Sequence, residues 1–214
     1  MYDVKSFSHC MKIVCIGRNY VAHAHELNND VPEEPVFFMK PDTSLLRHNK
    51  PFHLPDWSND IHHEIELVIR ISQPAKNIPA NLAEIYYDKI GLGIDFTARD
   101  LQNQLKSKGL PWEKAKAFDH AAVVGEKFIS KKSFGDYSNI SFSLDVNGKR
   151  VQSGNSGLMI FHFNDIISYI SKFITLKKGD LIYTGTPAGV GPVKAGDHLE
   201  GYLGVAKLLD FMIK

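Results

Sequence analysis

The chain has 214 residues, 43% of them apolar, and a formal net charge of +1. The apolar share supports a hydrophobic core and is too high for a disordered chain, while the even charge balance argues against nucleic acid as the main partner, which usually demands a basic patch. No apolar run approaches the roughly 18 residues of a membrane span, so we expect no membrane association.

The predicted elements are short and do not alternate regularly between strand and helix, which disfavours a doubly wound fold. Apolar, β-branched runs predict strands, and apolar residues at helical spacing predict helices. In chain order we expect a strand at 11–16, a helix at 18–27, a loop-like segment at 28–60 with a strand at 36–39, a strand at 65–71, a helix at 81–88, a strand at 89–95, a helix at 98–108, a hairpin at 144–151 turning at Asn147-Gly148, a helix at 164–174 and several short strands from 180 to 214. This pattern predicts one compact α+β domain.

Three acidic residues carry the clearest chemical signal. Glu64 and Glu66 flank the start of the predicted strand 65–71, and Asp95 ends the predicted strand 89–95. Alternate residues of a strand point to the same side, so Glu64 and Glu66 share a face. Two neighbouring carboxylates in an apolar strand repel unless a cation neutralises them, and oxygen ligands suit Mg²⁺, Mn²⁺ or Ca²⁺. A solvent-facing acidic edge explains the same spacing equally well.

A histidine and a lysine are candidates for proton transfer and charge stabilisation. His23 and Glu26 stand three positions apart on a predicted helix, where a carboxylate can orient an imidazole as a general base requires. His25 is the competing histidine, although its neighbour Glu26 would point to a different face. Near residue 115, Lys116 and Lys114 are equal candidates by chemistry alone.

Other motifs support weaker hypotheses. The run Gly185–Gly191 resembles a phosphate loop but lacks its Gly-Lys-Ser/Thr ending, so a tight turn with amides facing a small anion is favoured. The pair His62-His63 has no further His or Cys at zinc-site spacing. Ser156 does not lie in a Gly-x-Ser-x-Gly elbow, which disfavours a serine hydrolase.

Five motifs in order closely resemble the fumarylacetoacetate hydrolase family, on its branch of short acylpyruvases and oxaloacetate decarboxylases. The resemblance extends from residue 13 to about residue 207. Its motifs are Gly17-Arg18-Asn19-Tyr20, His62-His63-Glu64-Ile65-Glu66-Leu67, Asp95-Phe96-Thr97-Ala98-Arg99-Asp100, Gly109-Leu110-Pro111-Trp112, and the run from Gly179 to Gly191.

The resemblance implies a mixed β-sheet roll with short peripheral helices, usually a homodimer, formed by a single catalytic domain over 1–214 with an N-terminal extension at 1–12. It also implies roles for individual residues. Glu64, Glu66 and Asp95 would ligate Mg²⁺ or Mn²⁺, with Ca²⁺ possible in crystals. Catalysis would depend on Lys116 and on His23 and Glu26, which lie on a loop that orders into a short helix. The substrate would be bound by Arg18, Arg99, Gln102, Lys116 and Thr186.

The leading expectation is hydrolysis of the C–C bond of a 3-acylpyruvate, of the acetylpyruvate or fumarylpyruvate type, to pyruvate and a carboxylic acid. The alternatives are oxaloacetate decarboxylation or keto–enol tautomerisation, isomerisation of 2-hydroxyhepta-2,4-diene-1,7-dioate, and metal-dependent dicarboxylate binding without catalysis. The partner expected in each case is a small 2-oxo acid or dicarboxylate.

Two features of the sequence indicate the cellular location of the protein. The first residues, Met-Tyr-Asp-Val-Lys-Ser, lack the apolar core of a signal peptide. Cys10 and Cys15 are the only cysteines, and two cysteines in a chain of this size do not form a disulfide framework. We therefore expect a cytoplasmic protein.

Overall fold

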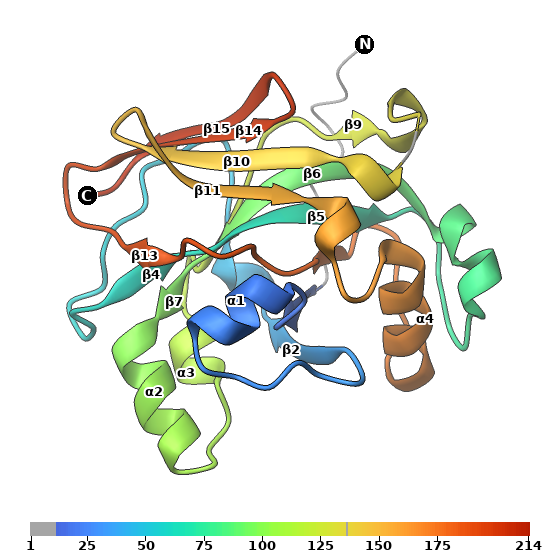
Figure 1. The fold of residues 1–214 in the computed structure, drawn as a ribbon, viewed down its shortest axis with the longest axis horizontal. Coiled ribbons are helices and arrows are strands. Elements are labelled where there is room, and N and C mark those ends of the chain that lie inside the picture. The colour runs from blue at the N-terminus through green and yellow to red at the C-terminus, as the bar shows by residue number, and fades with distance from the viewer. Residues whose placement is uncertain (1–11, 136) are drawn as a thin grey trace.

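A mixed β-sheet forms the centre of the computed structural model, which describes residues 12–135 and 137–214 (Figure 1). Its strands are β1 (Ile13–Gly17), β2 (Val36–Lys40), β3 (Leu45–Leu46), β5 (Ile65–Ile71), β6 (Tyr87–Asp95), β8 (Ala122–Val124), β9 (Ile129–Ser130) and β12 (Leu181–Tyr183). The strand order is β2-β1-β12-β5-β6-β8-β3, with β9 paired to β6. The pairs β1–β12 and β3–β8 are parallel and the others are antiparallel, so the sheet is mixed.

Two smaller sheets and a few short helices complete the α+β fold. A four-stranded sheet contains β10 (Ser141–Val146), β11 (Lys149–Asn155), β14 (His198–Leu203) and β15 (Ala206–Met212), and a three-stranded sheet contains β4 (Ile61–His63), β7 (Thr97–Ala98) and β13 (Gly191–Pro192). The helices are α1 (Val21–Glu26), α2 (Arg99–Ser107), α3 (Glu113–Lys116) and α4 (Phe163–Phe173), with 3₁₀ turns at Asp42–Ser44, Ala80–Tyr86, Lys131–Ser133, Tyr137–Asn139 and Ser156–Leu158. In Figure 1 the four-stranded sheet lies over β5 and β6, and α1, α2 and α3 gather on the other side of the central sheet.

Strand β5 separates the core from the acidic residues. Its residues Ile65, Leu67, Ile69 and Ile71 all lie in the main hydrophobic core. Val68, which points to the opposite face, packs in a smaller cluster with Cys15 and Tyr183. Because the side-chain period of a strand is two, Glu66 shares that second face with Val68.

Most sequence-predicted elements are confirmed within a residue or two. They include the strand at 65–71, the helices at 98–108 and 164–174, the hairpin, and the short strands after residue 180. The helix predicted at 81–88 is present as a 3₁₀ helix, Ala80–Tyr86, which ends two residues earlier than predicted. Tyr87 begins β6 two residues before the predicted strand, because Tyr87 pairs with Ile71 and is buried there.

The predicted helix at 18–27 and the predicted loop at 28–60 also need adjustment. The helix is shorter than predicted, since α1 contains only Val21–Glu26. The segment 28–60 contains β3 and a 3₁₀ turn in addition to the predicted strand. The proposed N-terminal extension and Cys10 lie outside the described residues, apart from residue 12, whereas Cys15 is a buried free cysteine.

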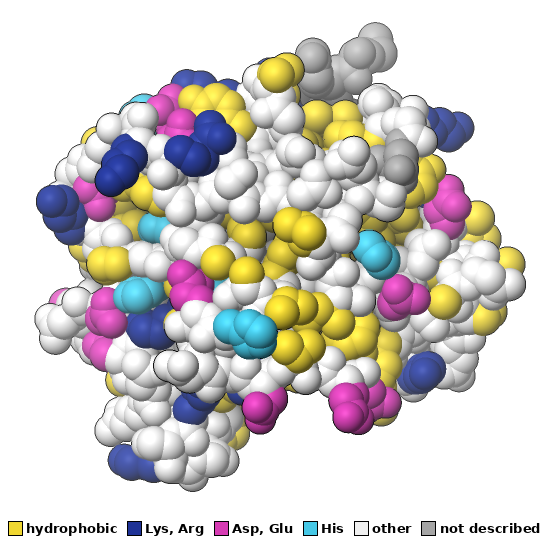
Figure 2. Space-filling model, in the orientation of Figure 1, with side chains coloured by type: hydrophobic (Ala, Val, Ile, Leu, Met, Phe, Trp, Pro, Cys, Tyr) yellow, Lys and Arg dark blue, Asp and Glu magenta, His cyan; other side chains and the backbone are white. Residues whose placement is uncertain are grey.

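The surface carries charges of both signs. On the face shown in Figure 2, Lys and Arg side chains lie among Asp and Glu side chains and form no continuous basic area. Over residues 12–135 and 137–214, no helix has both the length and the apolar character needed to cross a membrane.

Candidate active site

Three carboxylates converge where β5 begins and β6 ends. The antiparallel register pairs Ile65 with Ile94, and the Asp95 amide donates a hydrogen bond to the Glu64 carbonyl at 2.9 Å. One side-chain oxygen from each of Glu64, Glu66 and Asp95 lies within 4.8 Å of the other two. The exposed fractions of these residues are 5%, 1% and 1%. The alternative of a solvent-facing acidic edge is therefore wrong.

Positive side chains surround two of the three carboxylates. The Lys116 Nζ atom lies 2.7 Å from Glu64 Oε2 and 2.8 Å from Asp95 Oδ2, and Arg99 donates to Glu64 Oε1. Lys40 pairs with Asp95 Oδ1 at 2.6 Å from the other side. In the part of the chain that the structure describes, Glu66 has no Lys or Arg partner, and its Oε2 accepts only the Gly185 amide, at 2.6 Å.

The pKa values of Glu66 and Glu64 shift in opposite directions, because only Glu64 has Lys and Arg partners. Burial raises the pKa of Glu66 well above its usual value, and the charges of Asp95 and Glu64 add to the shift. Burial acts in the same direction on Glu64, but Lys116 and Arg99 outweigh it and hold that pKa below its usual value. A buried carboxylate next to two others has an electrostatic deficit that a divalent cation relieves. The donor set, which is all oxygen, therefore fits Mg²⁺ or Mn²⁺.

Helix α1 presents His23 to this cluster. His23 is only 6% exposed, whereas His25 is exposed. The Nδ1 atom of His23 lies 3.0 Å from Glu26 Oε2, and Glu26 Oε1 accepts the amide of Gly189 at 2.8 Å. Two partners thus fix the Glu26 carboxylate, which in turn orients the imidazole. The structure brings His23 into the pocket and leaves His25 outside it.

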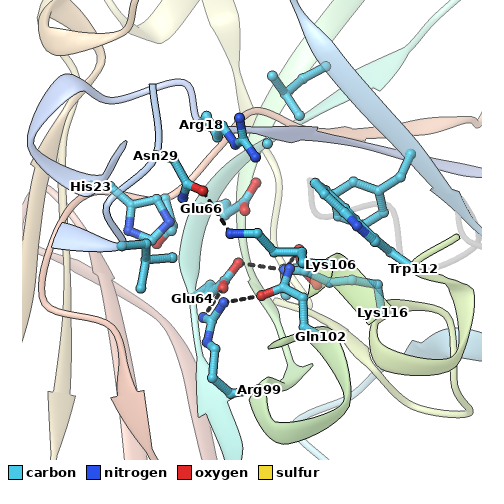
Figure 3. A pocket seen from close by; sticks show the side chains of 16 residues that line it. Arg18, His23, Asn29, Glu64, Glu66, Arg99, Gln102, Lys106, Trp112 and Lys116 are labelled. Atoms are coloured by element: carbon cyan, nitrogen blue, oxygen red, sulfur yellow. Dashed lines mark hydrogen bonds and ion pairs between the residues drawn. The ribbon is translucent and has the colours of Figure 1, made fainter. Parts of the chain in front are cut away.

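The carboxylates lie at the bottom of a pocket with about 470 Å³ of empty space, part of it open to solvent (Figure 3). All the site residues predicted from the sequence line this pocket except Glu26, which acts on it through His23. Phe38 and Trp112 form an apolar wall, with ring centroids 6.0 Å apart. Lys116 is buried in the pocket wall and Lys114 is exposed, so of these two lysines it is Lys116 that contacts the carboxylates.

The loop at 185–191 serves the site in a way that the sequence did not predict. Its amides face carboxylates of the protein itself, since Gly185 donates to Glu66 and Gly189 donates to Glu26. The prediction that the amides of this loop face a small anionic ligand is therefore wrong for Gly185 and Gly189. Gly185 has φ +100°, and a Cβ atom there would approach the Cβ of Asn19 to 2.7 Å, so a glycine is required.

Several polar residues near the pocket have structural partners. The Thr186 hydroxyl donates to the Ile65 carbonyl at 2.8 Å and accepts from Gln152 Nε2 at 2.9 Å. The Oε1 atom of the same glutamine accepts the Ile65 amide and contacts His63 Nδ1. His62 lies 2.9 Å from Asp60, and neither adjacent histidine belongs to the acidic cluster. The pair of histidines is therefore structural.

Sequence reasoning missed Lys40, Lys106 and Gln152. Lys40 ends β2 and is 1% exposed, and a lone lysine directly after the apolar run Val36–Met39 was an available signal. Lys106 lies on α2 and lines the pocket, on the same side as the predicted Arg99 and Gln102. Gln152 carries no local signal, because its role depends on the contact between β11 and β5.

Comparisons with known proteins identify the family of this chain. The family model described as Fumarylacetoacetate (FAA) hydrolase C-terminal matches residues 12–208. The oxaloacetate tautomerase YcgM of Escherichia coli (strain K12) is 41% identical over 188 residues, which cover 88% of this chain and 85% of that protein. The mitochondrial oxaloacetate decarboxylase of Dictyostelium discoideum is 44% identical over 190 residues, covering 88% and 87%. A crystal structure of fumarylpyruvate hydrolase from Pseudomonas aeruginosa, in complex with Mn²⁺ and pyruvate, superposes with a TM-score of 0.89 at 34% identity, covering 95% of this chain and 89% of that one.

Proposed function

The chain belongs to the fumarylacetoacetate hydrolase family, and we propose that it is a divalent-metal-dependent enzyme acting on a small 2-oxo acid, with oxaloacetate tautomerisation as the first candidate reaction. The observation that carries this proposal is the joint position of the carboxylate cluster and the His23–Glu26 pair in one pocket. Two of the relatives described above, from Escherichia coli and Dictyostelium discoideum, are named for reactions of oxaloacetate.

The carboxylate cluster and its cations would bind the reacting end of the substrate. A divalent ion held by Glu64, Glu66 and Asp95 would supply Lewis-acid stabilisation of the negative charge that develops on a keto oxygen. Lys116 adds a fixed positive charge beside the same carboxylates, in a buried position where electrostatic interactions are strong. Arg99, which is held by Glu64 and Gln102, lies next to it and provides further N–H donors.

His23 is the group that moves the proton. With Nδ1–H donated to Glu26, the Nε2 atom is free to act as a base. It would take a proton from the carbon next to the keto group of oxaloacetate, and the proton returned to the oxygen gives the enol. General acid–base catalysis of this kind typically contributes about 10²–10⁴-fold in rate.

Hydrolysis of a 3-acylpyruvate is the second candidate, and the same His23–Glu26 pair supports it. A base oriented by a carboxylate can activate a water molecule for attack on the distal carbonyl, which releases pyruvate and a carboxylic acid. The structural similarity to a hydrolase that was crystallised with Mn²⁺ and pyruvate also supports this reaction. The binding of Mg²⁺ or Mn²⁺ by this chain, the homodimer and the cytoplasmic location stay predictions.

A substrate screen with the purified protein tests the proposal. Oxaloacetate tautomerisation is followed by the ultraviolet absorbance of the enol, decarboxylation by pyruvate release, and hydrolysis by the loss of acetylpyruvate or fumarylpyruvate. We expect catalysis of at least one reaction with Mg²⁺ or Mn²⁺ and its loss after chelation. Full activity after exhaustive chelation would refute the metal dependence. Tight binding of 2-oxo acids without any turnover would instead identify a binding protein.

A further inference from the structure

Gln152 is a buried residue that uses every hydrogen-bonding position of its carboxamide. It lies on β11 and is 1% exposed. Its Oε1 atom accepts the Ile65 amide at 3.0 Å and lies 2.9 Å from His63 Nδ1. Its Nε2 atom donates to Thr186 Oγ1 and to the Pro187 carbonyl oxygen, both at 2.9 Å. A backbone amide can only donate and a carbonyl oxygen can only accept, so a single orientation of the carboxamide satisfies these partners.

These contacts join the loop at 185–191 to β11 and to the start of β5. Two partners of Gln152 belong to the loop, and the Ile65 amide belongs to β5. The loop also lies directly against β11, since a Cβ atom at Gly189 would approach the Val151 carbonyl oxygen to 2.3 Å. In Figure 1 this segment, which follows β12, passes between β11 and α1. A residue of the four-stranded sheet therefore sets the position of a loop beside the active site.

The loop in turn supplies amides to two carboxylates of the site. Gly185 donates to Glu66 Oε2 at 2.6 Å, and Gly189 donates to Glu26 Oε1 at 2.8 Å. The other oxygen of Glu26 lies 3.0 Å from His23 Nδ1. Both glycines have positive φ values, +100° and +99°, and a loop with such permissive positions depends on outside contacts for a single conformation. The two loop residues that Gln152 bonds lie between these glycines, where its contacts restrain both amides.

We propose that Gln152 is a positioning residue for the base, and that it acts by holding the loop at 185–191. With the loop in place, the Gly189 amide fixes Glu26, and Glu26 orients His23. Gln152 is not among the described residues that line the pocket, so it acts through the loop rather than on the substrate. This inference rests on the proposed function, because it assigns the base to His23. A displaced loop would release Glu26 and let the imidazole turn, and a misplacement of about 1 Å can cost on the order of 10²-fold in rate.

Two substitutions of Gln152 and one control test this role in the full-length protein at saturating Mg²⁺. Gln152→Glu keeps an oxygen for the Ile65 amide but removes the N–H donors that face the loop. Gln152→Met is uncharged and removes the donors as well, so agreement of the two variants excludes an effect of the added carboxylate charge. Ser171→Ala is the control, because Ser171 is also buried and accepts the Ile78 amide at 2.9 Å, but lies on α4 outside the pocket.

We expect kcat with a 2-oxo acid substrate to fall by about 10–100-fold in both Gln152 variants. KM should change by no more than about 3-fold, since Thr186 keeps its bond to the Ile65 carbonyl. In the His23→Ala background, Gln152→Glu should lower the residual kcat by less than about 2-fold, because the group that it positions is then absent. In hydrogen exchange with Mg²⁺ and oxalate, the Gly189 amide should lose about 10-fold or more of its protection in Gln152→Glu. Ser171→Ala should show none of these effects.

Unchanged kcat or unchanged exchange of the Gly189 amide in both Gln152 variants would overturn the inference. An equal fall of kcat in Ser171→Ala, or a full effect of Gln152→Glu in the His23→Ala background, would also overturn it. If neither variant folds, exchange in the wild-type protein decides. With Mg²⁺ and oxalate, protection of the Gly189 amide comparable to that of the Ile65 amide supports the role, and free exchange of Gly189 contradicts it. If the wild type turns over no 2-oxo acid but Gln152→Glu still exposes the Gly189 amide, the positioning role stands and the proposed enzymatic function fails.

Discussion

Lys40 holds a buried positive charge against the carboxylate cluster, and its replacement by methionine gives the most direct test of the electrostatic argument. Its side chain is 0% exposed and pairs with Asp95, whose side chain is 1% exposed. The same Nζ atom donates to the carbonyl groups of Lys116 and Ala121. Lys40→Met keeps a long apolar stem but removes one partner of a buried ion pair.

The expected loss of stability has two parts. Removing one partner of a buried pair typically costs about 3–5 kcal/mol, because the other charge stays buried and less compensated. Part of this cost, on the order of 1–3 kcal/mol, belongs to buried carbonyl groups that lose a donor. The remainder comes from the charge of Asp95, and a divalent ion in the cluster would replace the missing positive charge. The destabilisation should therefore be larger in EDTA than in saturating Mg²⁺.

Guanidinium unfolding followed by circular dichroism, at one fixed protein concentration, measures the loss of stability in EDTA and in saturating Mg²⁺. Lys89→Met is a matched control, since Lys89 lies half-buried on β6 of the same sheet and should change the free energy of unfolding by no more than about 0.5 kcal/mol. A loss for Lys40→Met that is equal with and without Mg²⁺ would show that Asp95 does not share its charge with a metal site. A loss no larger than that of the control would show that the pair contributes nothing.

Three further predictions concern the chemistry and the segment carrying the base. Glu66→Gln keeps an acceptor for the Gly185 amide but removes the charge of a metal ligand. Metal affinity measured by calorimetry should therefore fall by more than the roughly 10–100-fold that is typical when a residue that only hydrogen-bonds to a ligand is changed. Unchanged affinity would show that Glu66 is not a ligand. His23→Ala should slow acylpyruvate hydrolysis by about 10²–10⁴-fold and oxaloacetate decarboxylation less, since decarboxylation needs no activated water; equal losses in steady-state rates would assign His23 to binding or closure. Oxalate should protect amides of residues 21–29 from hydrogen exchange only when Mg²⁺ is present, and protection that oxalate does not change would make this segment a fixed part of the fold.

Local sequence patterns predicted the elements that carry the site. The alternation in Ile65–Ile71 placed Glu64 and Glu66 on one face, and the spacing of His23 and Glu26 placed them within reach of each other. These inferences succeeded because strand and helix periods are properties of neighbouring residues. The same reasoning failed at Tyr87, where strand pairing with Ile71 outweighs the local helical pattern.

Choices between chemically equal neighbours needed the tertiary structure, although the family resemblance pointed to the same residues. The residues around Lys114 and Lys116 do not say which lysine is buried, and only the packing of α3 against the sheet decides it. The position of Lys40 after an apolar run could have singled it out, but its partner could not be predicted locally, because Asp95 lies on a strand that is not adjacent to β2 in the sheet.

The amino-acid sequence by itself thus determined which residues can ligate a cation, transfer a proton or bind an anion, and which short elements carry them. Only the tertiary structure decided which of them meet. Glu26 and the Gly189 amide are 163 positions apart, and Glu64 and Lys116 are 52 positions apart, yet each pair forms a hydrogen bond. Such contacts depend on the register of β5 with β6 and on the loop that follows β12, and long-range strand pairing is set by the burial of whole faces rather than by any local pattern.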